Sequence, residues 1–190
     1  MRHRTLLAVV AFAALVGSAC STNRSDHWWK GVTPAGGTFG FGVYSDRNSG
    51  ERTTAVGFWF GAQLGYAATE NAALLGTVAV ITTPPGSEDM EPGEGRIQLH
   101  TGLGVRGYPI DAVGNLWFEG GFGGGVLGVE DGPNGFPGFD LTTALGWTVW
   151  DDNEVNFDFG VRVMSSRYTS NIEATGLFIT ASAFKYRFGP

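Results

Sequence analysis

The sequence predicts an all-β protein, an eight-stranded antiparallel up-and-down transmembrane β-barrel. Apolar residues alternate with polar or small ones in eight separate segments. None of these segments has a sustained helical period, and short polar connections alternate with longer ones along the chain. Because successive side chains of a strand lie on opposite faces, each segment forms a strand with one apolar and one polar face.

Composition narrows the class of protein. Only 16% of the 190 residues are charged, whereas a soluble surface usually carries roughly 25–35% charged residues. No run of 18 apolar residues occurs after the first 20, which excludes a helical membrane protein. The chain has 18 acidic against 12 basic residues, so we expect no nucleic-acid partner.

Residues 1–19 have the pattern of an export signal. A basic start is followed by the apolar stretch "TLLAVVAFAALV" and the small residues "GSA". Cys20 is the single cysteine, which excludes an internal disulfide. Two alternatives stay open at this position, because "LVGSAC" resembles a bacterial lipoprotein signal with an acylated Cys20 but also suits ordinary cleavage after Ala19.

The remaining chain divides into a polar, glycine-broken tether over 20–37 and a barrel over 38–188. Short connections are expected at 69–71, 111–114 and 151–153, and longer ones at 46–52, 83–95, 130–137 and 166–171. This alternation places all the short connections at one end of the barrel. The expected strands are 38–45, 53–68, 72–82, 96–108, 115–128, 138–150, 154–165 and 174–188.

The chemistry of the two faces predicts which one is inside. One face carries large apolar residues such as Leu103, Phe122 and Phe157, and the other is mostly Gly, Ala and Thr with one or two charges per strand. The second face is too weakly polar for a water-facing surface, but small side chains suit the crowded interior of an eight-stranded barrel. The apolar face is therefore expected to contact lipid, where β-structure is stable only as a closed barrel.

Several charged residues share the inward face of this arrangement. An isolated charge there would cost several kcal/mol, so we expect a connected network of opposite signs. Arg106 and Glu119 lie at nearly equal distances from the centre of the 111–114 turn, which predicts an ion pair between them. Asp158 and Arg162 are about 13 Å apart along one strand and should find partners on neighbouring strands. The predicted lumen charges are Arg106, Glu119, Asp140, Asp158, Arg162, Lys185 and Arg187.

With this pattern, the segment 38–188 resembles the small eight-stranded outer-membrane barrels of Gram-negative bacteria, the outer-membrane protein A and W-like group. The ending "FITASAFKYRF" is similar to the aromatic last strand that the barrel-assembly machinery reads in that group, with Phe184, Tyr186 and Phe188 expected to face outward. Gly189 and Pro190 follow, whereas members of the group often end on the aromatic residue. The resemblance implies a monomer in the bacterial outer membrane, in contact with membrane lipid, lipopolysaccharide and the assembly machinery.

Residues for catalysis are sparse. Some barrels of this class deacylate lipids with a serine and a histidine, but beyond the export signal the chain has only His27 and His100, and Thr101 follows His100 in place of a serine. The acidic loops lack the spacing of a calcium-binding loop. We therefore expect no enzyme, cofactor or metal site, and a structural or surface-interaction role. The alternatives are a narrow conduit for small or hydrophobic solutes and a soluble, lipocalin-like ligand-binding barrel.

Overall fold

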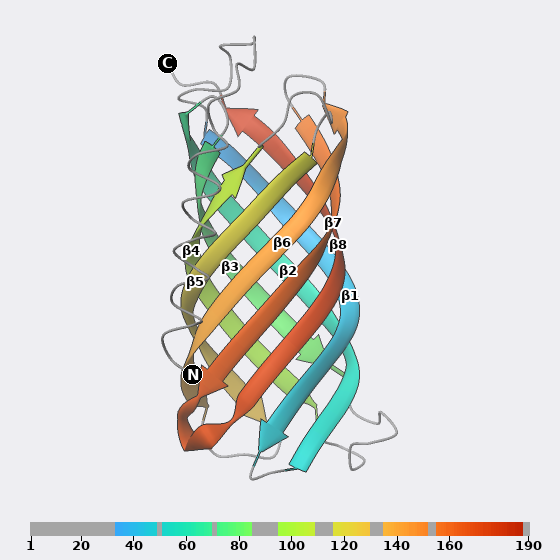
Figure 1. Cartoon of the computed structure of the whole chain (residues 1–190), viewed down its shortest axis with the longest axis vertical. Helices are drawn as coiled ribbons and strands as arrows, with labels where there is room; N and C mark the ends of the chain where they lie inside the picture. The colour runs from blue at the N-terminus through green and yellow to red at the C-terminus, as the bar shows by residue number, and fades with distance from the viewer. Residues whose placement is uncertain are drawn as a thin grey trace.

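The computed structural model describes residues 33–48, 51–69, 72–84, 95–108, 116–129, 135–151 and 155–187. The export signal, Cys20, most of the tether and Phe188 lie outside these ranges. Eight antiparallel strands form one closed barrel, as the sequence predicted (Figure 1). They are β1 Thr33–Asn48, β2 Glu51–Thr69, β3 Ala72–Thr83, β4 Arg96–Gly107, β5 Leu116–Val129, β6 Phe136–Asp151, β7 Val155–Tyr168 and β8 Glu173–Arg187.

Each strand pairs with its neighbours in sequence, and β1 closes the barrel on β8. The strands are tilted steeply against the long axis of the barrel (Figure 1). We call the end where β1 begins and β8 ends the terminal end, and the opposite end the loop end. Because closure pairs every strand on both sides, the described barrel has no free sheet edge.

Several strands extend beyond the bounds expected from the sequence. β1 begins at Thr33, so residues 33–37 belong to the barrel wall and not to the tether. Only residues 49 and 50 separate β1 from β2, because polar residues continue the ladder into the expected loop, with Arg47 opposite Arg52. A 3₁₀ turn, η2 (Thr169–Asn171), joins β7 to β8. Two of the four connections expected to be long are therefore short.

The outer face of the barrel is apolar. Phe41, Leu103 and Phe159 have exposed fractions of 51%, 64% and 55%. In each strand, the residues that alternate with such outward residues face the lumen. A soluble barrel has the opposite arrangement, with its large apolar side chains inside. Among the described residues, no helix has the length and apolar character that crossing a membrane requires.

Two apolar clusters occupy the lumen. The first lies toward the terminal end and includes Leu75, Trp117 and Phe184. The second lies toward the loop end and includes Trp59 and Phe178. All five of these side chains are at most 3% exposed, so the described lumen is filled with side chains at both levels.

Glycines make room for the largest of these side chains. A Cβ at Gly160 would lie 3.0 Å from the Trp117 ring and 2.6 Å from the Leu145 carbonyl oxygen, and a Cβ at Gly146 would overlap the same ring. The indole of Trp117 on β5 thus fits over two glycines on β6 and β7. Small residues on neighbouring strands leave the space that a large lumen side chain fills, which explains why the inner face is rich in Gly, Ala and Thr.

Candidate functional site: the charged lumen

Four charged side chains meet between the two apolar clusters. Arg106 comes from β4, Glu119 from β5, and Asp158 and Arg162 from β7. The strand register places Arg106 directly opposite Glu119, and this pair is the contact that the 111–114 turn predicted. All four side chains are at most 4% exposed.

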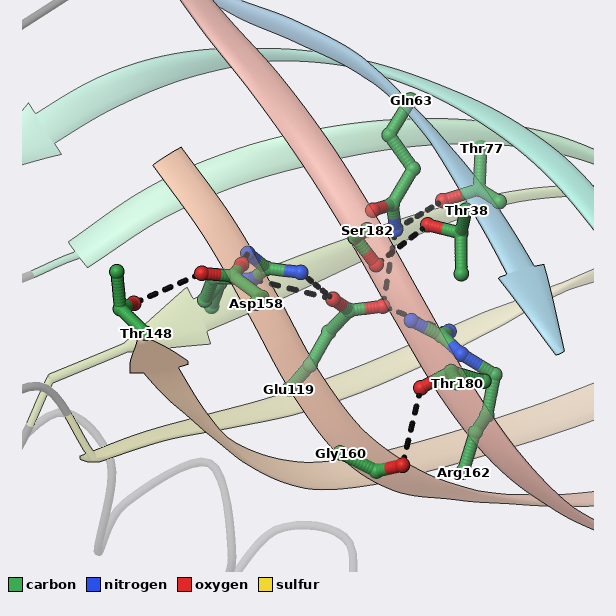
Figure 2. Close-up of polar contacts among 11 residues, drawn as sticks. Thr38, Gln63, Thr77, Glu119, Thr148, Asp158, Gly160, Arg162, Thr180 and Ser182 are labelled. Carbon is green, nitrogen blue, oxygen red and sulfur yellow. Dashed lines mark hydrogen bonds and ion pairs between the residues drawn. The ribbon is translucent and has the colours of Figure 1, made fainter. Parts of the chain in front are cut away.

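Glu119 is the centre of the network (Figure 2). Its Oε2 accepts a hydrogen bond of 2.9 Å from the Arg106 guanidinium, and its Oε1 accepts one of 2.7 Å from Arg162 Nη1. Gln63 Nε2 on β2 also donates to Oε1, at 3.0 Å. One carboxylate therefore joins side chains from β2, β4 and β7. Hydrogen bonds to a charged carboxylate are stronger than those between neutral groups, so these contacts hold the three strands together.

Arg106 extends the network to a second carboxylate. Its Nη1 donates to Asp158 Oδ2 at 2.6 Å, and Thr148 Oγ1 donates to the other oxygen of Asp158 at 2.8 Å. The Arg106 guanidinium lies 4.2 Å from the ring centroid of Trp117 and 4.5 Å from that of Phe184. Such contacts stabilise a cation where water is excluded, so the terminal-end cluster supports this arginine electrostatically as well as by packing.

The partners of Asp158 and Arg162 differ from the expectation in one respect. As predicted, they do not pair with each other, and Asp158 meets a neighbouring strand through the Thr148 hydroxyl of β6. Their charged partners, however, do not lie on adjacent strands. Asp158 reaches Arg106 on β4, and Arg162 reaches Glu119 on β5, both across the lumen. The reason is size, because an eight-stranded barrel is narrow enough for long side chains to span it.

The network is electrically balanced, with two guanidinium groups against two carboxylates. A buried ion pair offsets its desolvation only when geometry and hydrogen bonding are good. These groups meet that condition except at Arg162 Nε and Gln63 Oε1, which have no hydrogen-bond partner among the described residues. Chemically, the arrangement cross-links five strands, β2 and β4 to β7, and occupies the middle of the lumen. It presents no exposed nucleophile or base.

Asp140 lies in the lumen but belongs to a second polar group. His100 Nδ1 is 2.9 Å from Asp140 Oδ2, and Gln98 Nε2 and Tyr168 Oη each donate to Oδ1 at 3.4 Å. The expectation that Asp140 extends the arginine network is therefore wrong. His100 and Asp140 are 2% and 0% exposed, so this pair has no access to solvent.

The expectation for Lys185 and Phe184 is also wrong. Lys185 is exposed on the outer face, whereas Phe184 is 1% exposed and lies in the lumen. No bulge interrupts the pairing of β8 with β7, so the outward positions set by Leu177 and Ile179 continue at odd numbers through Lys185. The side chains of Tyr186 and Arg187, and all of Phe188, fall outside what the structure describes.

The sequence reasoning missed the contribution of β2. Gln63 and Trp59 share one face of this strand, and Trp59 lies 5.1 Å from the Arg162 guanidinium. The signal was present in the sequence, because Phe60 and Leu64 define the outward face of β2 by alternation and leave Gln63 on the inward face.

Within the described residues, no group of three or more histidine, cysteine, aspartate or glutamate side chains is placed to hold a metal ion.

Comparison with solved structures yields barrels of the same size. Neisserial surface protein A matches with a TM-score of 0.55 at 14% identity, covering 82% of this chain and 97% of that one. Ail, the attachment invasion locus protein of Yersinia pestis, was solved with the heparin analogue sucrose octasulfate. It matches with a TM-score of 0.55 at 11% identity, covering 82% and 98%. The outer membrane protein AlkL, solved in lipid bilayers, matches with a TM-score of 0.51 at 14% identity, covering 88% and 95%.

The chain has the fold of the small eight-stranded outer-membrane barrels. No family model matches the sequence, and no curated protein matches it. The likeness to this group therefore consists of the barrel itself, which in each matched structure corresponds to almost the whole chain. What such an outer-membrane barrel does depends on its own lumen and surface.

Proposed function

We propose that this protein is a bacterial outer-membrane barrel with a closed lumen, without enzymatic activity, and with a structural or surface-interaction role. The observation that carries the proposal is the uncharged belt on the outer face. Among the side chains whose exposure is described, the charged ones on this face lie only at its two borders. They are Arg47, Arg52, Arg167 and Glu173 at the loop end and Lys185 at the terminal end.

The height of the belt suits a bilayer. Glu173 and Lys185 lie on the same strand, β8, and only uncharged outward positions separate them. At about 3.3 Å per residue their separation along the strand is about 40 Å, which a tilt of about 45° reduces to about 28 Å of height. The apolar band of outer-membrane barrels is about 25 Å tall, so both charges would reach the interfaces.

The filled lumen favours a closed barrel over a conduit. The balanced network around Glu119 lies between two apolar clusters, and its arginines contact an aromatic ring of each. A solute would have to displace buried ion pairs to pass this level, at a cost of several kcal/mol. In this proposal the partners are outer-membrane lipid, lipopolysaccharide and the barrel-assembly machinery, and the absence of a free edge in the described wall is consistent with a monomer.

A pair of arginine substitutions on β8 tests the membrane assignment. Ile179 is 56% exposed in the middle of the belt, and Thr175 is exposed near its loop-end border. Ile179→Arg should lower the stability in phospholipid vesicles by about 2–4 kcal/mol, and Thr175→Arg by only about 0–1 kcal/mol. Urea unfolding followed by heat-modifiable gel mobility measures both. Equal losses, or wild-type protein in the soluble fraction of the cell, would refute a lipid-facing outer wall.

Planar-bilayer conductance tests the closed lumen separately. Wild-type protein should conduct no more than protein-free bilayers, because the charged level is packed on both sides. Steady conductance in the wild type would replace this part of the proposal with the conduit.

A further inference from the structure

The loop-end border of the outer face carries an arginine row that none of the lumen contacts uses. β2, β1, β8 and β7 are neighbours in the closed wall. The register places Arg52 opposite Arg47, Arg47 opposite Glu173, and Glu173 opposite Arg167. Four charged side chains therefore form one continuous row across four strands, and all of them are exposed.

Two further rows continue this pattern toward the middle of the belt. The next outward positions form a hydroxyl row, Thr54–Ser45–Thr175–Ser165, and the positions after them form an apolar row, Val56–Val43–Leu177–Val163. Neighbouring strands are about 4.8 Å apart, so each row spans about 15 Å. Charge, hydroxyl and hydrocarbon thus follow one another over one patch of the wall, in the order in which a lipid presents headgroup, linkage and acyl chain.

The arginine row is not neutralised within the described residues. It contains three arginines against one glutamate. The one ion pair of the row between described residues, from Arg167 Nη2 to Glu173 Oε1, is 3.6 Å long and joins side chains that are 65% and 54% exposed. Arg47 and Arg52 are directly opposed on paired strands, an arrangement of like charges that destabilises a sheet. A bound anion would remove this repulsion, and guanidinium groups bind phosphate in two-pronged geometry.

The hydroxyl row is already organised around one of these arginines. Arg52 Nε donates to Ser45 Oγ at 2.9 Å, and Thr54 Oγ1 donates to the same oxygen at 3.3 Å. Ser45 faces outward between Val43 and Arg47, yet it is only 8% exposed. The Arg52 side chain is thus held against the wall beside Arg47 and not extended into solvent.

Among the described residues, the patch is confined to one side of the barrel. At the same end of β4, β5 and β6, the described outward residues are apolar, as in Ile97, Val126 and Pro137. A charge requirement for solubility alone would not gather the described outward arginines on this one side of the barrel, on β2, β1 and β7. A site for one class of ligand explains the gathering.

From this geometry we infer that the arginine row (Arg52, Arg47, Arg167, with Glu173) binds the phosphate groups of membrane lipids whose acyl chains pack on the apolar row below it. The inference rests on the proposed membrane location, because only there do lipid headgroups reach the border of the belt. The ligand class is a phosphate-bearing lipid, of which the lipid A part of lipopolysaccharide is the example to test.

The test uses the full mature protein in phosphatidylcholine nanodiscs, with lipid A titrated as the probe and binding followed by the rise in melting temperature. One basic residue at a membrane surface contributes about a fivefold factor in affinity. We therefore expect about a fivefold weaker affinity for each of the single variants Arg47→Gln, Arg52→Gln and Arg167→Gln, and about a hundredfold weaker affinity for the triple variant. Lys185→Gln, an exposed cation at the opposite border of β8, is the matched control and should leave the affinity unchanged.

Two further arms decide the ligand. Lipid A stripped of its phosphates should bind no better to the wild type than to the triple variant. The inference would be overturned if the wild type bound the stripped lipid as tightly as intact lipid A, if the triple variant bound intact lipid A as tightly as the wild type, or if the row bound a sulfated polysaccharide in place of lipid A. Failure of the proposed membrane location shows separately, because the wild type would then not enter phosphatidylcholine nanodiscs at all.

Discussion

The arginines of the lumen and those of the outer wall differ in burial and in charge pairing. Arg106 and Arg162 are at most 3% exposed and meet Glu119 and Asp158 within 2.9 Å. Arg47, Arg52 and Arg167 are exposed and share one glutamate among the described residues. The first group is matched in number by carboxylates, and the second is not.

The difference separates charge that holds the fold from charge that is available for binding. A buried arginine must be neutralised by the protein itself, because water cannot reach it. An exposed arginine is solvated and contributes little to stability through an ion pair, so the described excess of such residues in the arginine row is available for binding a ligand.

Removing the central carboxylate of the lumen should cost the most. Glu119→Ala leaves the guanidinium groups of Arg106 and Arg162 without their shared acceptor, which should lower the free energy of unfolding by about 3–5 kcal/mol. Urea unfolding in detergent measures it.

A double-mutant cycle isolates the pair itself. Arg106→Ala combined with Glu119→Ala should cost less than the sum of the two single losses, because the pair is in direct contact. Additive losses would mean that the two charges are not energetically coupled, and the lumen arginines would then not differ from the exposed ones.

Adding a methyl group should destabilise the barrel at an inward glycine but not at an outward one. Gly146→Ala places a methyl group against the buried Trp117 ring and should destabilise the barrel by about 1–3 kcal/mol, the usual cost of overpacking. Gly124→Ala on the outer face, where the new Cβ lies 3.5 Å from the nearest backbone oxygen, is the matched control. Thermal unfolding of both variants should show a clear loss only for Gly146→Ala.

The exposed pair should have the smallest effect on stability. Glu173→Ala removes a contact of 3.6 Å between side chains that are more than half exposed, so the loss should stay within about 1 kcal/mol. Because the same change removes the one acidic member of the arginine row, it should also strengthen lipid A binding. A loss as large as that of Glu119→Ala would show that the row holds the fold together and is not poised for a ligand.

Much of the fold followed from alternation alone. The inward and outward faces of β4 to β7 and the up-and-down order are local properties, because side chains two residues apart share a face and short polar turns force adjacent strands to pair. The Arg106–Glu119 contact belongs to this class, since both residues are counted from the same turn. The inward Phe184 and outward Lys185 were available in the same way from Leu177 and Ile179. They were missed because the ending was aligned with the aromatic last strand of outer-membrane barrels and not with the alternation of this strand.

Contacts between residues that no turn connects were decided by the closed barrel. Asp158 meets Arg106 and Arg162 meets Glu119 because the barrel is narrow enough for side chains to cross it, and Asp140 pairs with His100 because it lies at a different level of the lumen. The arginine row depends on the pairing of β1 with β8, the one pair of strands with no connecting turn to set its register. Sequence alternation determined which side of the wall each of these residues faces. Only the circumference and stagger of the closed sheet decided which of them meet.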